Sequence, residues 1–128
     1  MRYSRVIIRI ETRDTVCSKS VLNEITDKVV KAAKESLGDK LDKVILYGSY
    51  ARGDFTDESD IDIMVIADVR LEDRHKVYDM IWSVTGDMDL EYDVIVSVHV
   101  ADCVTYYRFI NDLPFYININ TEGILLSA

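Results

Sequence analysis

One stretch of the sequence carries side chains at a spacing that suits chemistry on a phosphate. Gly48-Ser49 follows the apolar run Val44–Tyr47, and ten residues later Asp60-x-Asp62 opens a second apolar run. A glycine lets backbone amides approach an anion closely, and the serine hydroxyl adds a hydrogen-bond donor. We therefore interpret Gly48 and Ser49 as a seat for a phosphate.

The aspartates beyond this seat have the pattern of a metal site. Alternate residues of a strand point to one face, so Asp60 and Asp62 lie about 7 Å apart at the backbone and converge on one ion. Asp93 precedes the apolar run Val94–Val96, and it reaches the same pocket if that strand pairs beside the other. Two unit charges about 4 Å apart repel by about 4 kcal/mol at an effective dielectric near 20, so a cation must balance them. Ligands that are all oxygen favour Mg²⁺, or else Mn²⁺.

Other uses of the acidic residues stay open. Asp89 and Glu91 share the predicted strand face of the third carboxylate, so an error of two positions would exchange them. An alternative use is calcium binding, for which the loop offers oxygen donors at Asp54, Asp57, Ser59 and Asp60, but it lacks the central glycine and the closing glutamate of an EF-hand. We therefore favour the reading with a smaller divalent cation.

Several side chains near the motif have an ordinary structural explanation beside a functional one. Arg52 could contact a phosphate or pair with a nearby aspartate, and the sequence leaves both open. Tyr47 and Tyr50 flank the seat and could stack on a base, although aromatic residues at a strand end more often pack in a core. His75 and His99 have no catalytic spacing around them, so we expect surface histidines.

The elements that must position these residues follow from hydrophobic periodicity. An α/β or α+β fold is predicted, with a mixed sheet and helices packed on it. Helices are expected over 20–37, 71–85 and 101–111 and from Pro114 to Gly123, and strands over 5–11, 44–47, 60–67, 92–100 and 124–126.

Composition limits the size and the class of the protein. The chain has 128 residues and a formal net charge of −8, which predicts a single domain over 1–128, with its core at about 20–126, and argues against holding long nucleic acid. No run is apolar enough to span a membrane and no secretory signal is evident, so we expect a cytoplasmic protein. Cys17 and Cys103 form neither a zinc motif nor a disulfide framework.

The motif resembles the signature of the nucleotidyltransferase superfamily that includes DNA polymerase beta and the kanamycin nucleotidyltransferases. Its small members, the minimal nucleotidyltransferases, are the most similar. The resemblance covers about 20–126 and rests on these segments: Gly48-Ser49, Ala51-Arg52-Gly53, Asp60-x-Asp62, Tyr92-Asp93-Val94, Pro114-Phe115-Tyr116 and Glu122-Gly123-Ile124-Leu125.

The resemblance implies an activity and a partner. It implies transfer of AMP from ATP to a tyrosine of a small, all-helical HEPN protein, with the chain acting as the antitoxin of a toxin-antitoxin pair. Its implied binding residues for the triphosphate are Gly48, Ser49 and Arg52. Its implied metal ligands and catalytic residues are Asp60, Asp62 and Asp93.

The sequence leaves other readings open. An inactive module that binds a nucleotide or a partner and a transferase acting on a small hydroxylated molecule both remain, as do homo-oligomers and hetero-oligomers. Intact carboxylates beside an intact Gly-Ser pair favour activity.

Overall fold

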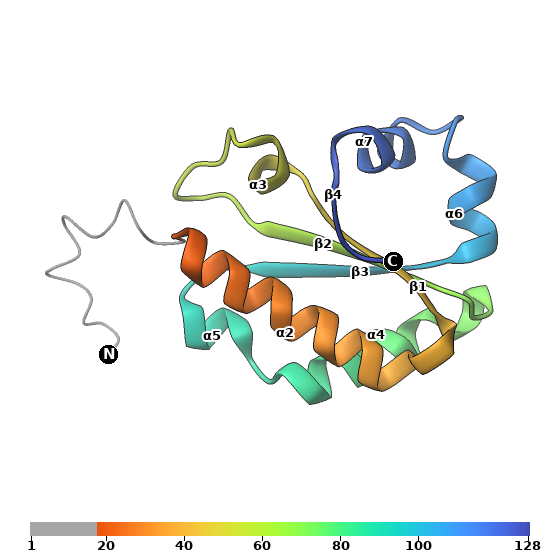
Figure 1. Ribbon diagram of the computed structural model, residues 1–128, viewed down its shortest axis with the longest axis horizontal. Helices are drawn as coiled ribbons and strands as arrows, with labels where there is room; N and C mark the ends of the chain where they lie inside the picture. The colour runs from red at the N-terminus through yellow and green to blue at the C-terminus, as the bar shows by residue number, and fades with distance from the viewer. Residues whose placement is uncertain (1–17) are drawn as a thin grey trace, which may run out of the picture.

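The computed structural model describes residues 18–128, and it is built around a four-stranded mixed sheet of order β3-β2-β1-β4. Its strands are β1 (Leu41–Tyr47), β2 (Ile61–Ala67), β3 (Val96–Asp102) and β4 (Ile124–Ser127). β1 is antiparallel to both β2 and β4, whereas β2 and β3 are parallel. Helices lie on both faces (Figure 1), which confirms the predicted fold class. The strand predicted over 5–11 lies outside the described residues.

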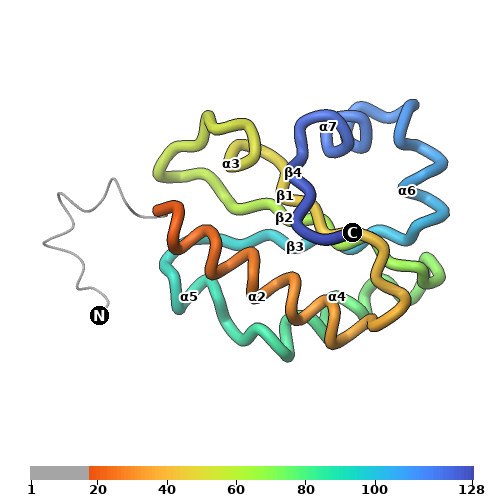
Figure 2. The backbone as a smooth tube through the Cα atoms, in the orientation of Figure 1, coloured from red at the N-terminus to blue at the C-terminus, as the bar shows by residue number. Residues whose placement is uncertain are grey.

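One face of the sheet is covered by the long helix α2 (Lys19–Leu37) and by α4 (Arg74–Thr85), which lie side by side in Figures 1 and 2. α2 begins where the Ser18 hydroxyl accepts a hydrogen bond from the Val21 amide at 3.2 Å. It ends at Gly38, whose φ of 54° is readily available only to glycine. Short 3₁₀ turns, η2 (Gly38–Lys40) and η3 (Leu71–Asp73), lead into β1 and α4.

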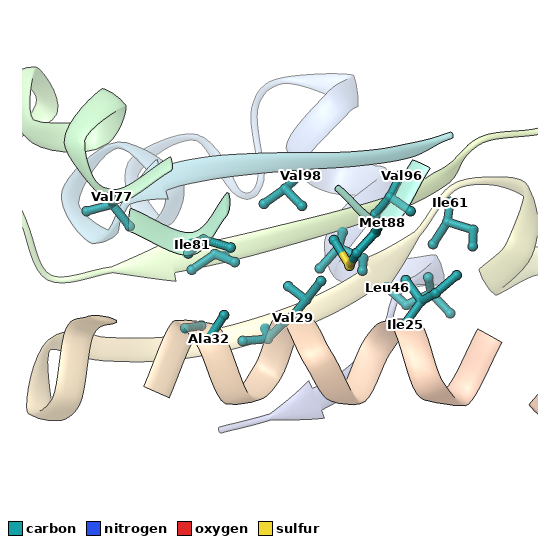
Figure 3. Close-up of a cluster of buried hydrophobic side chains, with 14 of the residues drawn as sticks. Ile25, Val29, Ala32, Leu46, Ile61, Val77, Ile81, Met88, Val96 and Val98 are labelled. Carbon is teal, nitrogen blue, oxygen red and sulfur yellow. The ribbon is translucent and has the colours of Figure 1, made fainter. Parts of the chain in front are cut away.

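The main core lies between these helices and the sheet. Apolar residues of α2 at helical spacing, such as Ile25, Val29 and Ala32, face alternate residues of β2 and β3 (Figure 3). In β2 these are Ile61 and Ile63, which are fully buried. Since strand side chains alternate, burying this set turns Asp62 toward the opposite face.

The opposite face carries α6 (Cys103–Phe109) and α7 (Pro114–Glu122) over a smaller apolar cluster. Tyr106 and Ile119 anchor the two helices there, each 2 % exposed or less. Gly123 lets the chain turn from α7 into β4, because a Cβ at this position would collide with the Ile119 carbonyl and with Ile45 of β1. α7 is thereby held beside the end of β1.

One local expectation is corrected, and two local features are added to the predicted elements. The third strand begins at Val96, not at residue 92, because Asp87 caps a short helix, α5 (Met88–Tyr92), by accepting a hydrogen bond from the Leu90 amide. A four-residue helix, α3 (Ser49–Arg52), lies between the strands predicted over 44–47 and 60–67. In α6, Tyr106 takes the buried position and Val104 is 72 % exposed.

None of the helices within residues 18–128 has the length and apolar character needed to cross a bilayer.

Candidate active site

The predicted phosphate seat lies directly against one of the predicted metal ligands. The antiparallel register of β1 and β2 pairs Tyr47 with Asp62, so Gly48, the next residue, passes beside that carboxylate. Gly48 has a φ of 76°, and a Cβ built on it would collide with Asp62 Oδ2. Glycine is required here both for the backbone conformation and for the space that the carboxylate occupies.

Asp60 and Asp62 are brought together at the start of β2. Asp60 immediately precedes the strand and Asp62 is its second residue, and both side chains are partly buried. Burial raises the pKa of Asp62 above its ordinary value, and the neighbouring Asp60 carboxylate raises it further. His99 and Arg52 oppose this shift. The site therefore carries negative charge that its own side chains only partly balance.

α3 places the rest of the seat. Ser49 is its first residue, and the amides of Ala51 and Arg52 both donate to the Gly48 carbonyl at 3.1 Å. The first amides of a helix have no acceptor inside it, so the Ser49 amide and hydroxyl remain available to an anion.

Arg52 is the last residue of α3 and forms ion pairs, which is one of the two uses left open by the sequence, while its contact with a phosphate stays a prediction. Its Nε donates to Asp54 at 3.1 Å, and its Nη1 approaches Glu122, the last residue of α7, at 3.5 Å. The guanidinium links α3 to α7 while remaining 43 % exposed.

Asp93 is not where the sequence placed it. It is the C-cap of α5 with a left-handed φ of 57°, and it lies outside β3. The parallel register of β2 and β3 pairs Asp62 with Ser97, so serine occupies the strand position beside this carboxylate. Nowhere in residues 18–128 do three or more His, Cys, Asp or Glu side chains gather as a metal site. The role of Asp93 as a ligand stays a prediction.

Sequence reasoning missed an aromatic cluster beside Asp62. The rings of Tyr47, His99 and Phe115 meet edge to face, with centroids 5.8 to 6.3 Å apart. They come from β1, β3 and α7, so no local spacing could have joined them. The one available signal was strand alternation, which puts His99 on the same face as Ser97. Tyr50, by contrast, is a core residue that stacks on Phe55.

A cavity of about 200 Å³ opens between the Gly48 bend and α7. Its lining combines apolar, aromatic, amide and charged groups: Tyr47, Gly48, Arg52, Phe115, Asn118, Ile119 and Glu122. Gly48 is therefore shared between this cavity and the carboxylate pair.

Comparison with known protein families identifies one that matches most of the chain. The family described as "Nucleotidyltransferase domain" matches residues 26–124. The chain belongs to that family. The matched residues include the Gly48 bend, the Asp60 and Asp62 pair and all of α7.

One relative agrees with this assignment at the level of sequence. The chain is 35 % identical over 97 residues to "Putative protein adenylyltransferase MJ0604" of Methanocaldococcus jannaschii, covering 76 % of this chain and 89 % of that one. The fold is similar to the crystal structure of "a putative nucleotidyltransferase" from Sulfolobus solfataricus, with a TM-score of 0.50 and 23 % identity over 81 % of this chain and 77 % of that one. A Shewanella oneidensis MNT antitoxin, solved with a tri-AMPylated HEPN toxin, aligns with a TM-score of 0.49 and 20 % identity, covering 84 % and 72 % of the respective chains.

The donor set of this nucleotidyltransferase fits Mg²⁺ or Mn²⁺. Mg²⁺ is commonly held by one or two carboxylates, with the oxygens of substrate phosphates and water completing its shell. Asp60 and Asp62 supply such a pair. Burial first and the Asp60 carboxylate second raise the pKa of Asp62, and a bound cation would favour the charged form that both disfavour. Binding of Mg²⁺ or Mn²⁺ at this pair does not require a third carboxylate from the protein.

Proposed function

We propose that the protein is a metal-dependent adenylyltransferase that moves AMP from ATP to a hydroxyl group of another protein. The observation that carries the proposal is the contact between Gly48 and Asp62, because it joins a phosphate seat to a partly buried carboxylate pair. A nucleoside triphosphate with its divalent ion fits this arrangement, because its phosphates bind at the seat and the ion binds to the carboxylates.

Each residue has a defined part in this proposal. The Gly48 bend and the Ser49 amide and hydroxyl hold the β- and γ-phosphates, and Arg52 neutralises part of their charge. Asp60 and Asp62 hold the divalent ion, which supplies charge neutralisation at the phosphates when bound. Positioning and electrostatic stabilisation then account for the catalysis, as in other phosphoryl transfers.

The reaction is a substitution at the α-phosphorus. The acceptor oxygen bonds to this phosphorus, the bond to the bridging oxygen of the β-phosphate breaks, and pyrophosphate leaves. The acceptor hydroxyl must lose its proton as this happens. Asp93 is our candidate for assisting that step, since Asp93 and Asp60 both lie just before the parallel strands β3 and β2 and so at the same end of the sheet.

The acceptor we propose is a tyrosine of a small helical HEPN protein, which makes this chain the antitoxin of the pair. The support is the resemblance to the minimal nucleotidyltransferases carried by Gly48-Ser49, Ala51-Arg52-Gly53 and Pro114-Phe115-Tyr116. The relative from M. jannaschii, whose name describes transfer to protein, adds support for a protein acceptor.

The test is transfer of label from ATP in the presence of Mg²⁺ and the product of the adjacent gene. We expect mass spectrometry to find one or more added AMP groups on a tyrosine of that product, and chelation of the metal to abolish them. Label on a small hydroxylated molecule would replace the protein acceptor. Binding of ATP with no label on any acceptor would overturn the activity and leave a nucleotide-binding module.

A further inference from the structure

The cavity between the Gly48 bend and α7 is too small for a whole nucleotide. Its volume is about 200 Å³, whereas pockets that enclose drug-sized ligands run from about 300 to 1,000 Å³. A planar heterocycle fits this space. Because Gly48 and Arg52 belong both to the cavity wall and to the phosphate seat, a ligand whose ring lies in the cavity can place its phosphates at the seat.

The walls of the cavity suit an aromatic ring. Phe115 is 47 % exposed although it is a large apolar side chain, and its ring meets that of Tyr47 edge to face at 5.8 Å. Ile119, at the floor, is 2 % exposed. A stacking surface beside a buried aliphatic floor favours a flat, partly apolar ligand.

One polar group in the wall is both available and able to read a base edge. Asn118 is exposed on α7, and its side-chain amide makes no hydrogen bond to any other residue within 18–128. Arg52 and Glu122, the charged groups of the wall, are already paired with each other, and Arg52 also with Asp54. The Asn118 carboxamide therefore offers this wall a hydrogen-bond donor and acceptor side by side on one planar group.

We propose that this cavity is the nucleobase subsite and that the Asn118 carboxamide selects adenine there, with Phe115 as the stacking surface. This inference rests on the proposed function and extends it to base selection. A carboxamide presents one donor and one acceptor, which match N7 and the amino group of adenine. The same edge of guanine presents two acceptors, N7 and O6, so the carboxamide oxygen would face a carbonyl oxygen.

Guanine and cytosine are disfavoured for separate reasons. Guanine is usually read by an arginine through N7 and O6, and here the arginine of the cavity wall, Arg52, is assigned to the phosphates by the proposed function. Cytosine has a matching donor and acceptor pair, but its single ring offers Phe115 less surface. The expected order of affinity is ATP first, with GTP and CTP weaker.

The experiment compares binding of ATP, GTP, CTP and inorganic tripolyphosphate, each with Mg²⁺, to wild-type protein and three variants. Asn118→Ala removes both the donor and the acceptor, and Asn118→Asp keeps an acceptor but loses the donor. Both should lower the ratio of ATP affinity to GTP affinity by about tenfold. Asn120→Ala is the matched control, because Asn120 is an exposed asparagine of the same helix that does not line the cavity. It should bind all four ligands as the wild type does.

The outcomes separate this inference from the proposed function. Wild-type protein that binds tripolyphosphate as tightly as ATP, or Asn118 variants that keep the wild-type ratio of ATP to GTP affinity, would overturn the base subsite and leave the phosphate seat standing. Wild-type protein that binds neither ATP nor tripolyphosphate would overturn both. Thermal melts of each variant verify that the proteins compared are folded.

Discussion

Gly48 leaves open the space that the Asp62 carboxylate fills. The contact depends on two separate properties of the glycine, its φ of 76° and its missing Cβ. Gly86 shares the first property without the second, since its φ is 75° and a Cβ there would meet no atom within 4 Å. Comparing the same substitution at Gly48 and at Gly86 therefore separates the cost of backbone strain from the cost of the steric collision with Asp62.

Gly48→Ala should abolish ATP binding and lower stability by more than the same change at Gly86. A non-glycine residue in this backbone region costs about 1 to 3 kcal/mol, and the alanine methyl at position 48 must in addition displace the Asp62 carboxylate. Urea unfolding of both variants measures the loss of stability, and ATP titration measures the loss of ATP binding. A Gly48→Ala protein that binds ATP with wild-type affinity would show that the contact is unnecessary.

Asp62→Asn should remove transfer activity while keeping or increasing the stability of the metal-free protein. The folded protein holds the pKa of Asp62 above 3.8, through burial first and Asp60 second. The folded state then binds a proton more readily than the unfolded state, so wild-type stability falls as pH rises from 3.8 through the raised pKa. The variant has no titrating group at this site and escapes that loss.

Melting temperatures of wild type and Asp62→Asn in chelator, followed from about pH 3 to pH 7, check this sign. The advantage of the variant should grow across the lower part of the range and then level off. Asp57→Asn, at an exposed loop residue with no hydrogen bond or ion pair to the rest of residues 18–128, should track the wild type throughout. A metal-free Asp62→Asn protein that is much less stable at pH 7 would contradict the argument.

Asp93→Asn should lower the rate of transfer by less than Asp62→Asn does. Asn tolerates the left-handed conformation at this position, so the change tests the carboxylate and not the fold. Asp93 lies outside β3, and Ser97 stands opposite Asp62, which favours an assisting role over direct ligation. Single-turnover rates at saturating Mg²⁺ make the comparison. An unchanged rate would remove Asp93 from the mechanism, and a loss equal to that of Asp62→Asn would make it a full ligand.

Arg52→Ala should weaken tripolyphosphate binding by about tenfold or more, the scale of a lost hydrogen bond between charged groups. The melting temperature should hardly move, because the ion pairs of Arg52 with Asp54 and Glu122 are exposed. Arg70→Ala is the control, since Arg70 also forms exposed pairs, with Glu72 and Asp73, and lies outside the cavity beside Gly48. Equal affinity in the two variants would exclude Arg52 from the phosphate seat.

Short-range sequence patterns determined much of the fold and of the candidate site. The spacing of Gly48-Ser49 from Asp60-x-Asp62 is a property of one continuous segment, and strand alternation alone puts both aspartates on one face. The apolar positions of α2 and the glycine that ends it likewise obey short-range rules.

Tertiary structure decided the parts that depend on pairing between distant segments. The correction at residues 92–95 is different, because it comes from short-range contacts: the Leu90 amide donates to Asp87 and the Val96 amide donates to Asp89, so this stretch ends α5 and precedes β3. The parallel register of β2 and β3 places Ser97 beside Asp62, and this register depends on the pairing of two segments that are distant in the sequence. The cavity forms where β1, α3 and α7 meet, and the ring cluster around Phe115 forms where β1, β3 and α7 meet. A periodicity measured along one segment holds no information about which segments will meet.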